Sequence, residues 1–560
     1  MITALGHGRV RLKALHAGAR VYQTAMRLDD VKAITAFAAK AAASARKQFD
    51  SAIRKGDLFD QLRRELDELN ASGAMAAAQV DAEDKESGVH RAPDDPHRLA
   101  RIHLFAEHHH ADRPTLVNLG HDFLAWDGRR YVQDRDVSGV LTATIERDFA
   151  RLNKEQAGAA GDKDVPAKPR AARKVTTRLV NDARHALASL VRVPASLDEP
   201  AWLTATDEPF PAREVVPFPN ALVSLPRYAR GEPCSLDPTP AFFSTRCLPY
   251  EFDPEAPRPR RWLGFLRELW PDDPESVQAL REWFGYCLVP DTSLQKILMV
   301  IGPTRSGKGT IGRVLTDLIG RDGVAAPSLA TLASHFGAAS LIGKLVAIVP
   351  DARLSGRADQ DVLVERMLSI SGEDRMEIDL KHRDSWVGTL PTRLMLLSNE
   401  VPRLRDASLA LANRLVVLRL TRTFLGREDT ALTDRLRGEL PGIFNWAVKG
   451  WHRLQHRGQF APPASSREIL RDVRNIASPV AQFIAEVCEI RPDAEVSTER
   501  IYARFREWCE AQGKFVIPDK AVFGRDLRAV MPTLANRQRA VGGQRTHCFC
   551  GIRLRLEGLA

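Results

Sequence analysis

The ten residues IGPTRSGKGT, at positions 301–310, constrain this chain more than any other stretch. They follow the apolar run KILMVI, which predicts a buried strand, and they lead into GTIGRVLTDLIG, whose apolar residues have helical spacing. A glycine-rich loop of the form G-x-x-x-x-G-K between a strand and a helix is typical of loops whose backbone N–H groups converge on phosphate oxygens. The N-terminus of the helix adds partial positive charge. We therefore predict a phosphate-binding loop over residues 302–310.

The whole loop is a candidate nucleotide contact, with Lys308 expected to reach the β- and γ-phosphates. The predicted contacts are Gly302, Pro303, Thr304, Arg305, Ser306, Gly307, Lys308, Gly309 and Thr310. Gly309 is irregular, because loops of this kind carry Ser or Thr at that position to contact Mg²⁺. Thr310 is the nearest hydroxyl, and together with Asp351 it is a candidate contact of the metal. We expect Thr310 to help at the phosphates, while an acidic group elsewhere and water hold the metal.

Three polar residues follow the loop at the ends of predicted elements. Asp351 comes directly after an apolar run that ends at Val349, and it is a candidate for orienting Mg²⁺ or the attacking water. Asn399 ends the apolar run of PTRLMLLSNEVP, where an amide could position that water. Arg414 lies between a predicted helix and a strand, where it could act on a neighbouring subunit's nucleotide. A turn carboxylate and an ordinary surface arginine are the alternatives for Asp351 and Arg414.

Alternation in RMEIDLKHRDSWVG predicts a β-hairpin with Lys381, His382 and Arg383 near its tip. Cationic residues on a projecting tip suit contacts with a phosphate backbone, and a solvated hairpin is the alternative. The formal net charge of +10 is compatible with a polyanionic partner, although a merely basic surface would give the same value.

Cysteine usage and hydropathy exclude several classes of protein. The seven cysteines include no CxxC pair, so neither a disulfide framework nor a zinc ribbon is supported. The start of the chain lacks an apolar signal core, and the longest apolar runs are far shorter than the ~20 residues of a membrane span. We expect a cytoplasmic protein with no membrane partner. For the run His108–His110 we favour a solvated helix end over a metal site.

Changes in composition suggest four parts. Residues 1–95 read as a helical, Ala-rich N-terminal region, and the acidic, turn-prone DAEDKESGVHRAPDDPHR at its end suggests a linker. Residues 96–290 contain a predicted hairpin, FLAWDGRRYV, and a mobile excursion at about 152–175. Residues 291–460 alternate β-branched runs with helices, which predicts a parallel α/β domain. Residues 478–560 predict three helices and a strand pair, a winged-helix DNA-binding domain with Arg537, Arg539 and Arg545 on its strands, and a winged helix that docks on protein is the alternative.

The order of these features resembles that of the superfamily 3 helicases, a branch of the AAA+ ATPases. It resembles more closely the phage and plasmid primase family related to the poxvirus D5-type primase-helicases. The downstream stretches that carry the resemblance are GPTRSGKGTI, ISGEDRMEID, LSNEVPRLRDASLALANRLVVL and LPGIFNWAVKGWHRL. The upstream stretches are FLAWDGRRYV, FPNALVSL, LPYEFDPEAPRPRRWLGFLRELW and ESVQALREWFGYCL. Together they span about residues 100–460, and LKHRD also resembles the hairpin tip of the papillomavirus and polyomavirus helicases.

This resemblance implies an α/β, AAA+-type P-loop ATPase core that works as a homo-hexameric ring on single-stranded DNA with ATP and Mg²⁺. It implies the roles of ATP loop for residues 302–310, catalytic acid for Asp351, sensor for Asn399 and trans-acting arginine for Arg414, with Lys381 and His382 on DNA. Gly309 is less unusual in this light, because a GKGT form of the loop is familiar in the primase-linked branch.

The chain departs from the family pattern in two ways. Pro350-Asp351 supplies one acid where two are common, and no primase site is evident, so a separate primase is a further expected partner. The expected function is an ATP-dependent DNA helicase that replicates a phage, plasmid or integrated element. The alternatives are an ATP-regulated DNA-binding or origin-recognition protein without processive unwinding, and a chain that binds nucleotide without turnover.

Overall fold

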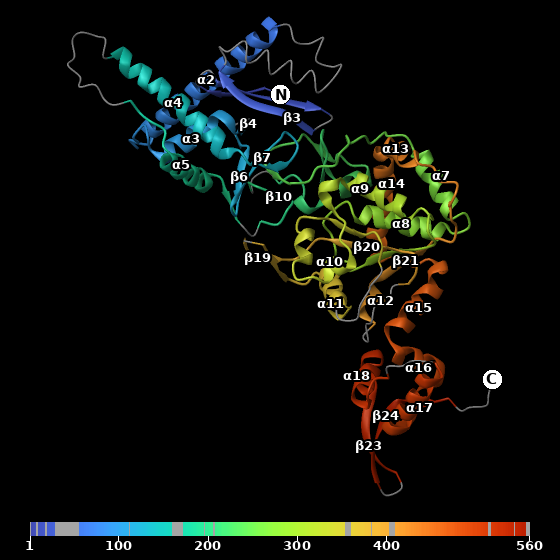
Figure 1. Cartoon of the computed structure of the whole chain (residues 1–560). Coiled ribbons are helices and arrows are strands. Elements are labelled where there is room, and N and C mark those ends of the chain that lie inside the picture. Colours follow the sequence, from blue (N-terminus) through green and yellow to red (C-terminus); the bar gives the residue numbers. More distant parts are fainter. Residues whose placement is uncertain are drawn as a thin grey trace. The chain divides into compact units, whose positions relative to one another are not determined.

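The computed structural model describes residues 2–6, 9–16, 19–27, 55–110, 113–159, 172–194, 197–204, 208–352, 360–381, 383–401, 409–512, 517–541 and 544–555. For the described residues among 2–27, for 55–70 and 474–477, and for a few positions beside the gaps, it describes the backbone alone. The chain divides into two compact units (Figure 1), one formed by Met1–Ala205 with Thr239–Thr245 and the other by Thr206–Pro238 with Arg246–Ala560.

The first unit begins with an antiparallel sheet of β1 (Ile2–Gly6), β2 (Arg9–His16) and β3 (Ala19–Arg27). The prediction of helix over residues 1–95 is wrong for these residues. The run RVRLKALH of β2 alternates polar and apolar residues, a period of two that favours a strand over a helix. The Ala-rich stretch at 31–49 lies outside the described residues, and LFDQLRRELDELNA belongs to helix α2 (Lys55–Glu86), as predicted.

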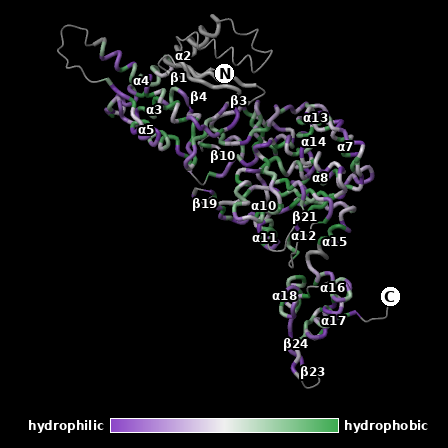
Figure 2. The backbone as a smooth tube through the Cα atoms, in the orientation of Figure 1, coloured by the Kyte–Doolittle hydropathy of each residue, from purple (hydrophilic) through white to green (hydrophobic). Residues whose placement is uncertain are grey.

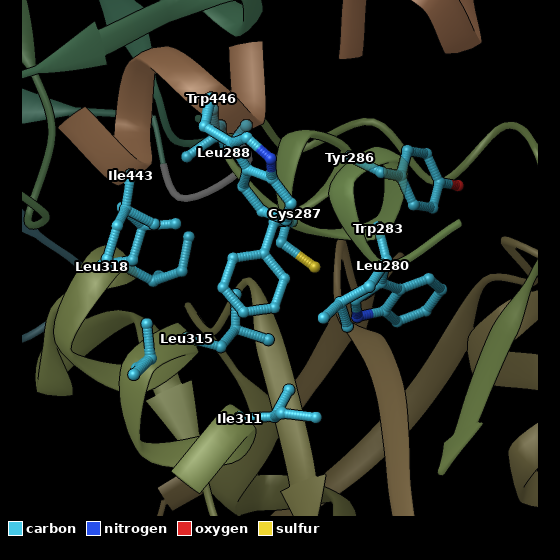
Figure 3. Close-up of a cluster of buried hydrophobic side chains, with 14 of the residues drawn as sticks. Leu280, Trp283, Tyr286, Cys287, Leu288, Ile311, Leu315, Leu318, Ile443 and Trp446 are labelled. Carbon is cyan, nitrogen blue, oxygen red and sulfur yellow. The ribbon is translucent and has the colours of Figure 1, made fainter. Parts of the chain in front are cut away.

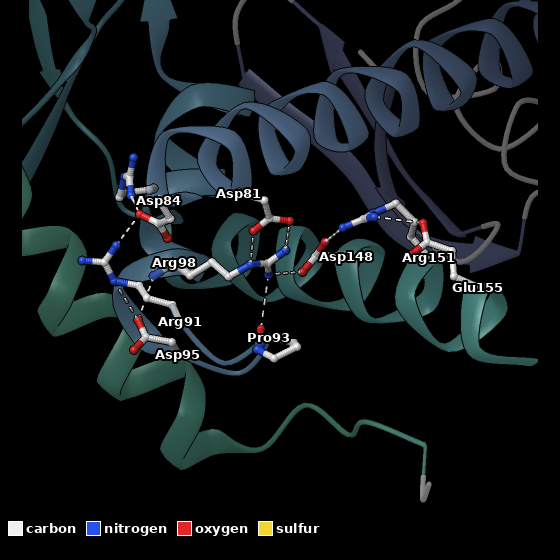
Figure 4. A network of polar contacts seen from close by, with 10 residues as sticks. Asp81, Asp84, Arg91, Pro93, Asp95, Arg98, Asp148, Arg151 and Glu155 are labelled. Carbon is white, nitrogen blue, oxygen red and sulfur yellow. Dashed lines mark hydrogen bonds and ion pairs between the residues drawn. The ribbon is translucent and has the colours of Figure 1, made fainter. Parts of the chain in front are cut away.

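Helices α2, α3 (Pro96–Glu107) and α4 (Val137–Ala159) are joined by a polar network centred on Arg98, which is buried (Figure 4). The Arg98 guanidinium donates to both oxygens of Asp81 at 2.6 and 2.9 Å and to Asp148 at 2.7 Å. Burial opposes the charge of Arg98, but these hydrogen bonds outweigh it and hold the pKa of Arg98 above its usual range. Asp95 is the N-cap residue of α3, so the predicted boundary between residues 95 and 96 falls inside one compact unit.

A second sheet in this unit has the order β8-β7-β6-β9, and its hairpin confirms the prediction for FLAWDGRRYV. The strands are β6 (Leu116–Leu119), β7 (Asp122–Trp126), β8 (Tyr131–Gln133) and β9 (Arg192–Val193). The remaining elements of the unit are β4 (His109–His110), β5 (Arg113–Pro114), α5 (Thr177–Leu190), β10 (Ala201–Trp202) and β14 (Phe242–Phe243). Residues up to Ala159 of the predicted excursion continue α4, and 160–171 lie outside the described residues.

From the sequence we expected His108 to be solvated, and the structure shows that it is not. It is buried at the end of α3, with its ring centroid 5.1 Å from that of His103. Burial lowers the pKa of both rings, that of His103 to about 3. Both rings are therefore neutral parts of the packing at ordinary pH.

The second unit is built on a parallel sheet of five strands in the order β16-β17-β20-β15-β21. The strands are β15 (Ile297–Ile301), β16 (Val324–Ala325), β17 (Val346–Val349), β20 (Arg393–Ser398) and β21 (Leu415–Arg419). Alternate residues of β15 face two different cores: Leu298 and Val300 join one, while Ile297 and Met299 join the other. A parallel sheet covered on both faces is the expected home of such continuous apolar strands.

Helices α7 (Arg260–Leu269), α8 (Pro274–Tyr286), α9 (Lys308–Ile319) and α14 (Leu440–Arg457) supply the first core. Figure 3 shows side chains of α8, α9 and α14 pointing toward one another around Cys287, whose burial raises its pKa to about 12. Helices α10 (Leu329–Ala333), α11 (Gln360–Ser371), α12 (Ala410–Arg414) and α15 (Arg467–Ala477) supply the second. Hydrophobic residues (green in Figure 2) run through these elements.

The last part of this unit has the element order α16, β22, α17, α18, β23, β24 around its own core. Its helices are α16 (Pro479–Val487), α17 (Thr498–Ala511) and α18 (Lys520–Val530). Its strands are β22 (Cys488–Ser497), β23 (Ala535–Val541) and β24 (Gln544–Leu554), in the order β22-β24-β23. Three helices and a terminal hairpin match the prediction, and β22 is an additional strand. None of the helices in the described part of the chain is long and apolar enough to cross a membrane.

The second unit has further short elements before and after its main sheet. They are η1 (Ala212–Glu214), β11 (Val215–Pro217), β12 (Leu222–Ser224), α6 (Leu225–Arg230), β13 (Ser235–Leu236), η2 (Arg321–Gly323), η3 (Gly337–Leu341), β18 (Met376–Leu380), β19 (Arg383–Gly388), α13 (Leu432–Arg437) and η4 (Ala464–Ser466).

Candidate nucleotide-binding site

The sheet brings the phosphate loop, Asn399 and Asp351 to the carboxyl ends of three neighbouring strands. Ile301, the last residue of β15, pairs with Ser398, and Asn399 follows Ser398 directly. The backbone N–H of Gly302 donates to the Ser398 carbonyl at 3.2 Å. β17 lies on the other side of β20, and its last residue is two positions before Asp351. The loop, the amide and the carboxylate therefore lie at the carboxyl ends of neighbouring parallel strands, where α/β sheets bind ligands.

Two glycines of the loop are required by its geometry. A Cβ at Gly302 would stand 2.6 Å from the Leu420 Cβ and 2.7 Å from the Leu420 carbonyl oxygen. Gly307 has φ +93°, in the left-handed region, and a Cβ there would stand 2.9 Å from Leu269. Gly307 caps α9 without a side-chain hydrogen bond to the first turn. The start of α9 thus keeps N–H groups for an anion.

Lys308 lies inside the loop. Its Nζ donates to the carbonyls of Gly302 and Pro303, both at 2.7 Å, and to the hydroxyl of Ser306 at 3.2 Å. Burial lowers the pKa of Lys308, and the carboxylate of Asp351 opposes that shift. The strands that precede the two residues, β15 and β17, flank β20 on either side, so the carboxylate and the ammonium group lie at the same ends of these strands.

The segment after β21 supports the loop from outside, which the sequence did not indicate. The N–H of Leu420 donates to Ile301 at 2.7 Å, the Thr423 hydroxyl to the Thr304 carbonyl at 2.8 Å, and the N–H of Phe424 to the Arg305 carbonyl at 2.9 Å. Arg305, with φ +59°, also lies 3.6 Å from a carboxylate oxygen of Glu428. These bonds anchor the loop to the segment that follows β21.

Gly309 is not required by packing. A Cβ there would meet only the Nη1 of Arg313, at 3.3 Å, which is the far end of a flexible side chain. Arg313 also donates from Nη2 to the Thr310 hydroxyl at 2.9 Å. A metal ion bound to that hydroxyl would lie beside a guanidinium, and two unit charges 4 Å apart near a surface repel by roughly 4 kcal/mol, with a divalent ion doubling this. The predicted metal contact at Thr310 does not fit this arrangement, whereas the exposed Asp351 carboxylate fits an Mg²⁺ ligand.

The second acid that the sequence left open is not identified. Asp361 and Glu365 lie exposed on α11, and Asp359 is outside the described residues. Asn399 is half-buried next to the loop, where an amide can reach the site.

Arg414 lies at the other ends of the strands, where β15 and β21 begin. It precedes Leu415, which pairs with Ile297 at the start of β15, whereas the loop follows the end of β15. At about 3.3 Å per residue the two levels are roughly 16 Å apart, so Arg414 is beyond reach of the loop in the same chain. Its guanidinium donates to the Leu368 carbonyl and to the Ser371 hydroxyl at the end of α11.

The predicted hairpin is confirmed as β18 paired with β19, where Leu380 pairs with Arg383 across a tip that contains Lys381. His382 and the side chain of Arg383 lie outside the described residues. Beside this tip lies a pair that we did not predict. The Lys381 Nζ lies 5.8 Å from the centre of the Phe336 ring, which is 42% exposed, and His335 contacts Asp379 at 3.0 Å. An exposed aromatic ring beside a cation is a surface on which a base can stack.

The three arginines predicted on the C-terminal strands do not form one surface. Arg537 pairs with Cys548 and Arg539 with Thr546, whereas Arg545 pairs with Ala540. Since directly opposed residues share a face, Arg545 lies on the other face from Arg537 and Arg539. Arg539 is also held by Glu495 at 2.6 Å, which compensates its charge.

Three segments of the chain match protein-family models. Residues 103–271 match the family described as D5 N terminal like, residues 300–414 match a family of unknown function (DUF5906), and residues 478–556 match the RFX DNA-binding domain. The first match supports the D5-like part of the resemblance, and the third fits the prediction of DNA binding. The second spans the loop, Asp351, Asn399 and Arg414.

Solved structures of the C-terminal region of NrS-1 in its apo form are similar to part of the chain. Two of them have 13% and 12% sequence identity and TM-scores of 0.34 and 0.36. In each comparison the similarity covers 54% of this chain and 77% of that chain.

Proposed function

We propose that the protein is an ATP-dependent DNA helicase of the D5-like primase-helicase type, with an AAA+ core that works as a ring. One observation carries the proposal: a phosphate loop, a carboxylate and an amide lie at the carboxyl ends of the parallel strands, while Arg414 lies at their amino ends. Because these groups lie at opposite ends of the strands, a neighbouring copy is needed to bring an arginine to the loop. The D5-like and RFX matches are further support.

Within one chain, the loop and the start of α9 bind the phosphates, and Lys308 exchanges its loop carbonyls for phosphate oxygens. Mg²⁺, when bound, would neutralise charge between the β- and γ-phosphates, with Asp351 as its protein ligand. Asn399, directly after the strand that lies between β15 and β17, orients the attacking water. Catalysis then depends mainly on positioning and on charge, as in other phosphoryl transfers.

Arg414 acts on the nucleotide of the adjacent copy. Among the described residues no carboxylate lies within ion-pairing distance of its guanidinium, so its charge is compensated only by a carbonyl and a hydroxyl. Burial lowers the pKa of Lys296 and the nearby charge of Arg414 lowers it further. Two cations that repel each other at one edge of the sheet would be stabilised by the γ-phosphate of a neighbour.

The hairpin of β18 and β19 contacts single-stranded DNA. Lys381 attracts the phosphate backbone, and Phe336 gives a base a ring on which to stack, a contact worth about 1–3 kcal/mol. The C-terminal part that matches the RFX model binds duplex DNA. Both contacts would weaken with salt, because they release counterions.

The test is to measure ATP hydrolysis, with and without single-stranded DNA, and strand separation of a tailed duplex. The native chain should hydrolyse ATP faster with DNA, and Lys308→Ala should lose both activities. Phe336→Ala and Lys381→Ala should weaken binding of single-stranded DNA and slow strand separation. Leu190→Ala is the matched control, because Leu190, on α5, is a large apolar residue exposed to nearly the same extent as Phe336 (43%). Strand separation that survived the loss of both Phe336 and Lys381 would refute the hairpin's role.

A second function is favoured by the match of residues 478–556 to the RFX DNA-binding domain. The chain would then be an ATP-regulated DNA-binding or origin-recognition protein without processive unwinding. Such a protein would bind a duplex site with an affinity that changes with ATP, and it would not separate the strands of a tailed duplex under conditions in which it hydrolyses ATP.

A further inference from the structure

Arg313 has no part in the proposed function, yet its guanidinium is held at the phosphate end of α9. It lies one helical turn after Gly309 and is exposed. Nη2 donates to the Thr310 hydroxyl at 2.9 Å, and Nε donates to the hydroxyl of Thr433, on α13, at 3.2 Å. Long side chains of a helix lean toward its N-terminus, which directs this one toward the phosphate loop.

The charge of Arg313 is left without an acidic partner in the described part of the chain. No carboxylate there lies within 4.0 Å of its guanidinium, and both of its hydrogen-bond acceptors are neutral hydroxyls. The nearby arginines of α13 differ: Arg437 pairs with Asp317 at 2.9 Å and Arg435 pairs with Asp429. A fixed guanidinium whose neighbours leave its charge uncompensated is suited to bind an anion through two N–H groups.

Gly309 provides the room in which this guanidinium lies. A Cβ at position 309 would stand 3.3 Å from the Arg313 Nη1, which is tighter than ordinary van der Waals contact. A Ser or Thr side chain at this position would therefore displace the guanidinium. The absence of a side chain at position 309 is therefore what allows the Arg313 guanidinium to lie beside the start of α9.

We propose that Arg313 binds the phosphate chain of the nucleotide and replaces, with a fixed positive charge, the metal contact that a hydroxyl at position 309 would make. This inference rests on the proposed nucleotide site and adds a binding residue to it. It predicts that nucleotide binding depends less on Mg²⁺ than a hydroxyl-bearing loop would allow, because part of the phosphate charge is neutralised by the protein itself.

The experiment measures binding of a fluorescent ATP analogue to the full chain, once with Mg²⁺ and once with EDTA. Arg313→Ala should weaken binding about tenfold or more in EDTA and less with Mg²⁺, and Arg313→Lys should recover part of the loss. Arg437→Ala is the matched control, because it removes another arginine that contacts α9 but has its own carboxylates. Adding Gly309→Ser to Arg313→Ala should restore binding only when Mg²⁺ is present.

The outcomes separate this inference from the proposed function. If the native chain binds the analogue, Lys308→Ala does not, and Arg313→Ala binds like the native chain in both buffers, the role of Arg313 is refuted while the nucleotide site stands. If the native chain and Lys308→Ala bind equally or not at all, the nucleotide site itself is refuted, and the role of Arg313 with it.

Discussion

At the scale of single residues, the glycines of the loop are not equivalent. Gly302→Ala would place a Cβ 2.6 Å from Leu420, and because a backbone carbonyl is also within 2.7 Å the strain cannot be relieved by a side-chain rotation. We expect a loss of about 1–3 kcal/mol in the free energy of unfolding and a distorted loop that binds nucleotide poorly. The measurement is chemical denaturation, with binding of a fluorescent ATP analogue to the folded variant.

Gly309→Ala is the matched control, because position 309 is helical and meets only the tip of Arg313. It should leave stability unchanged or raise it by up to about 1 kcal/mol, since alanine loses less backbone entropy than glycine. Equal destabilisation by both substitutions would contradict the view that Gly302, and not Gly309, is required by packing.

The same pair of residues marks how far a sequence can predict this site. The loop was predictable because strand, loop and helix are contiguous and the glycine pattern is local. The contact of Gly302 with Leu420 was not, because it depends on how β21 leaves the sheet. Arg313 could have been noticed, since residues four apart on a helix are neighbours, but its anchor at Thr433 comes from a distant helix.

At the scale of elements, burial of Arg98 joins three helices of the first unit. Among the residues that the structure describes, Arg98→Met would leave the buried Asp148 with Arg151 as its only ion-pair partner. Removing one partner of a buried ion pair costs about 3–5 kcal/mol, because the remaining charge stays in a poor solvent. We expect faster hydrogen exchange throughout α3, measured by mass spectrometry of its peptides.

Arg178→Ala is the control for this prediction. Arg178 lies on α5 and is 91% exposed, 3.8 Å from Asp182, so its removal should change stability by less than about 0.5 kcal/mol. If the two variants exchanged alike, the network around Arg98 would not be what holds α2, α3 and α4 together.

Alternation of polar and apolar residues predicted some of the strands and not others. The hairpin of β18 and β19 was predicted correctly, because polar and apolar residues alternate on both sides of its tip. The strands β2 and β3 were missed, although RVRLKALH alternates in the same way, because the Ala-rich composition of the region favours helix. The turn at 87–95 suggested a linker, and only the ion pairs of Arg98 with Asp81 and Asp148 reveal that it is enclosed by packed helices.

At the scale of the whole molecule, the distance across the sheet decides what Arg414 can do. The arginine and the loop lie at opposite ends of β15, so one chain cannot bring them together. Arg414 also has a second, local role, since it donates to the Leu368 carbonyl and the Ser371 hydroxyl at the end of α11. Loss of activity in Arg414→Ala alone would therefore not distinguish a shared site from a loosened helix end.

Mixing two inactive variants makes this distinction. Lys308→Ala keeps Arg414 but lacks a working loop, and Arg414→Ala keeps the loop but lacks the arginine. In a ring with head-to-tail contacts, some interfaces join an Arg414→Ala subunit, which supplies an intact loop, to a Lys308→Ala subunit, which supplies an intact Arg414. Such an interface contains both parts of the site. Random mixing at equal amounts should restore roughly a quarter of the native ATP hydrolysis if interfaces work independently.

Each variant alone should stay nearly inactive, and Ser371→Ala, which removes one acceptor of Arg414 but not its charge, should retain hydrolysis. A mixture no more active than its components, at concentrations where the native chain forms rings, would refute the shared site.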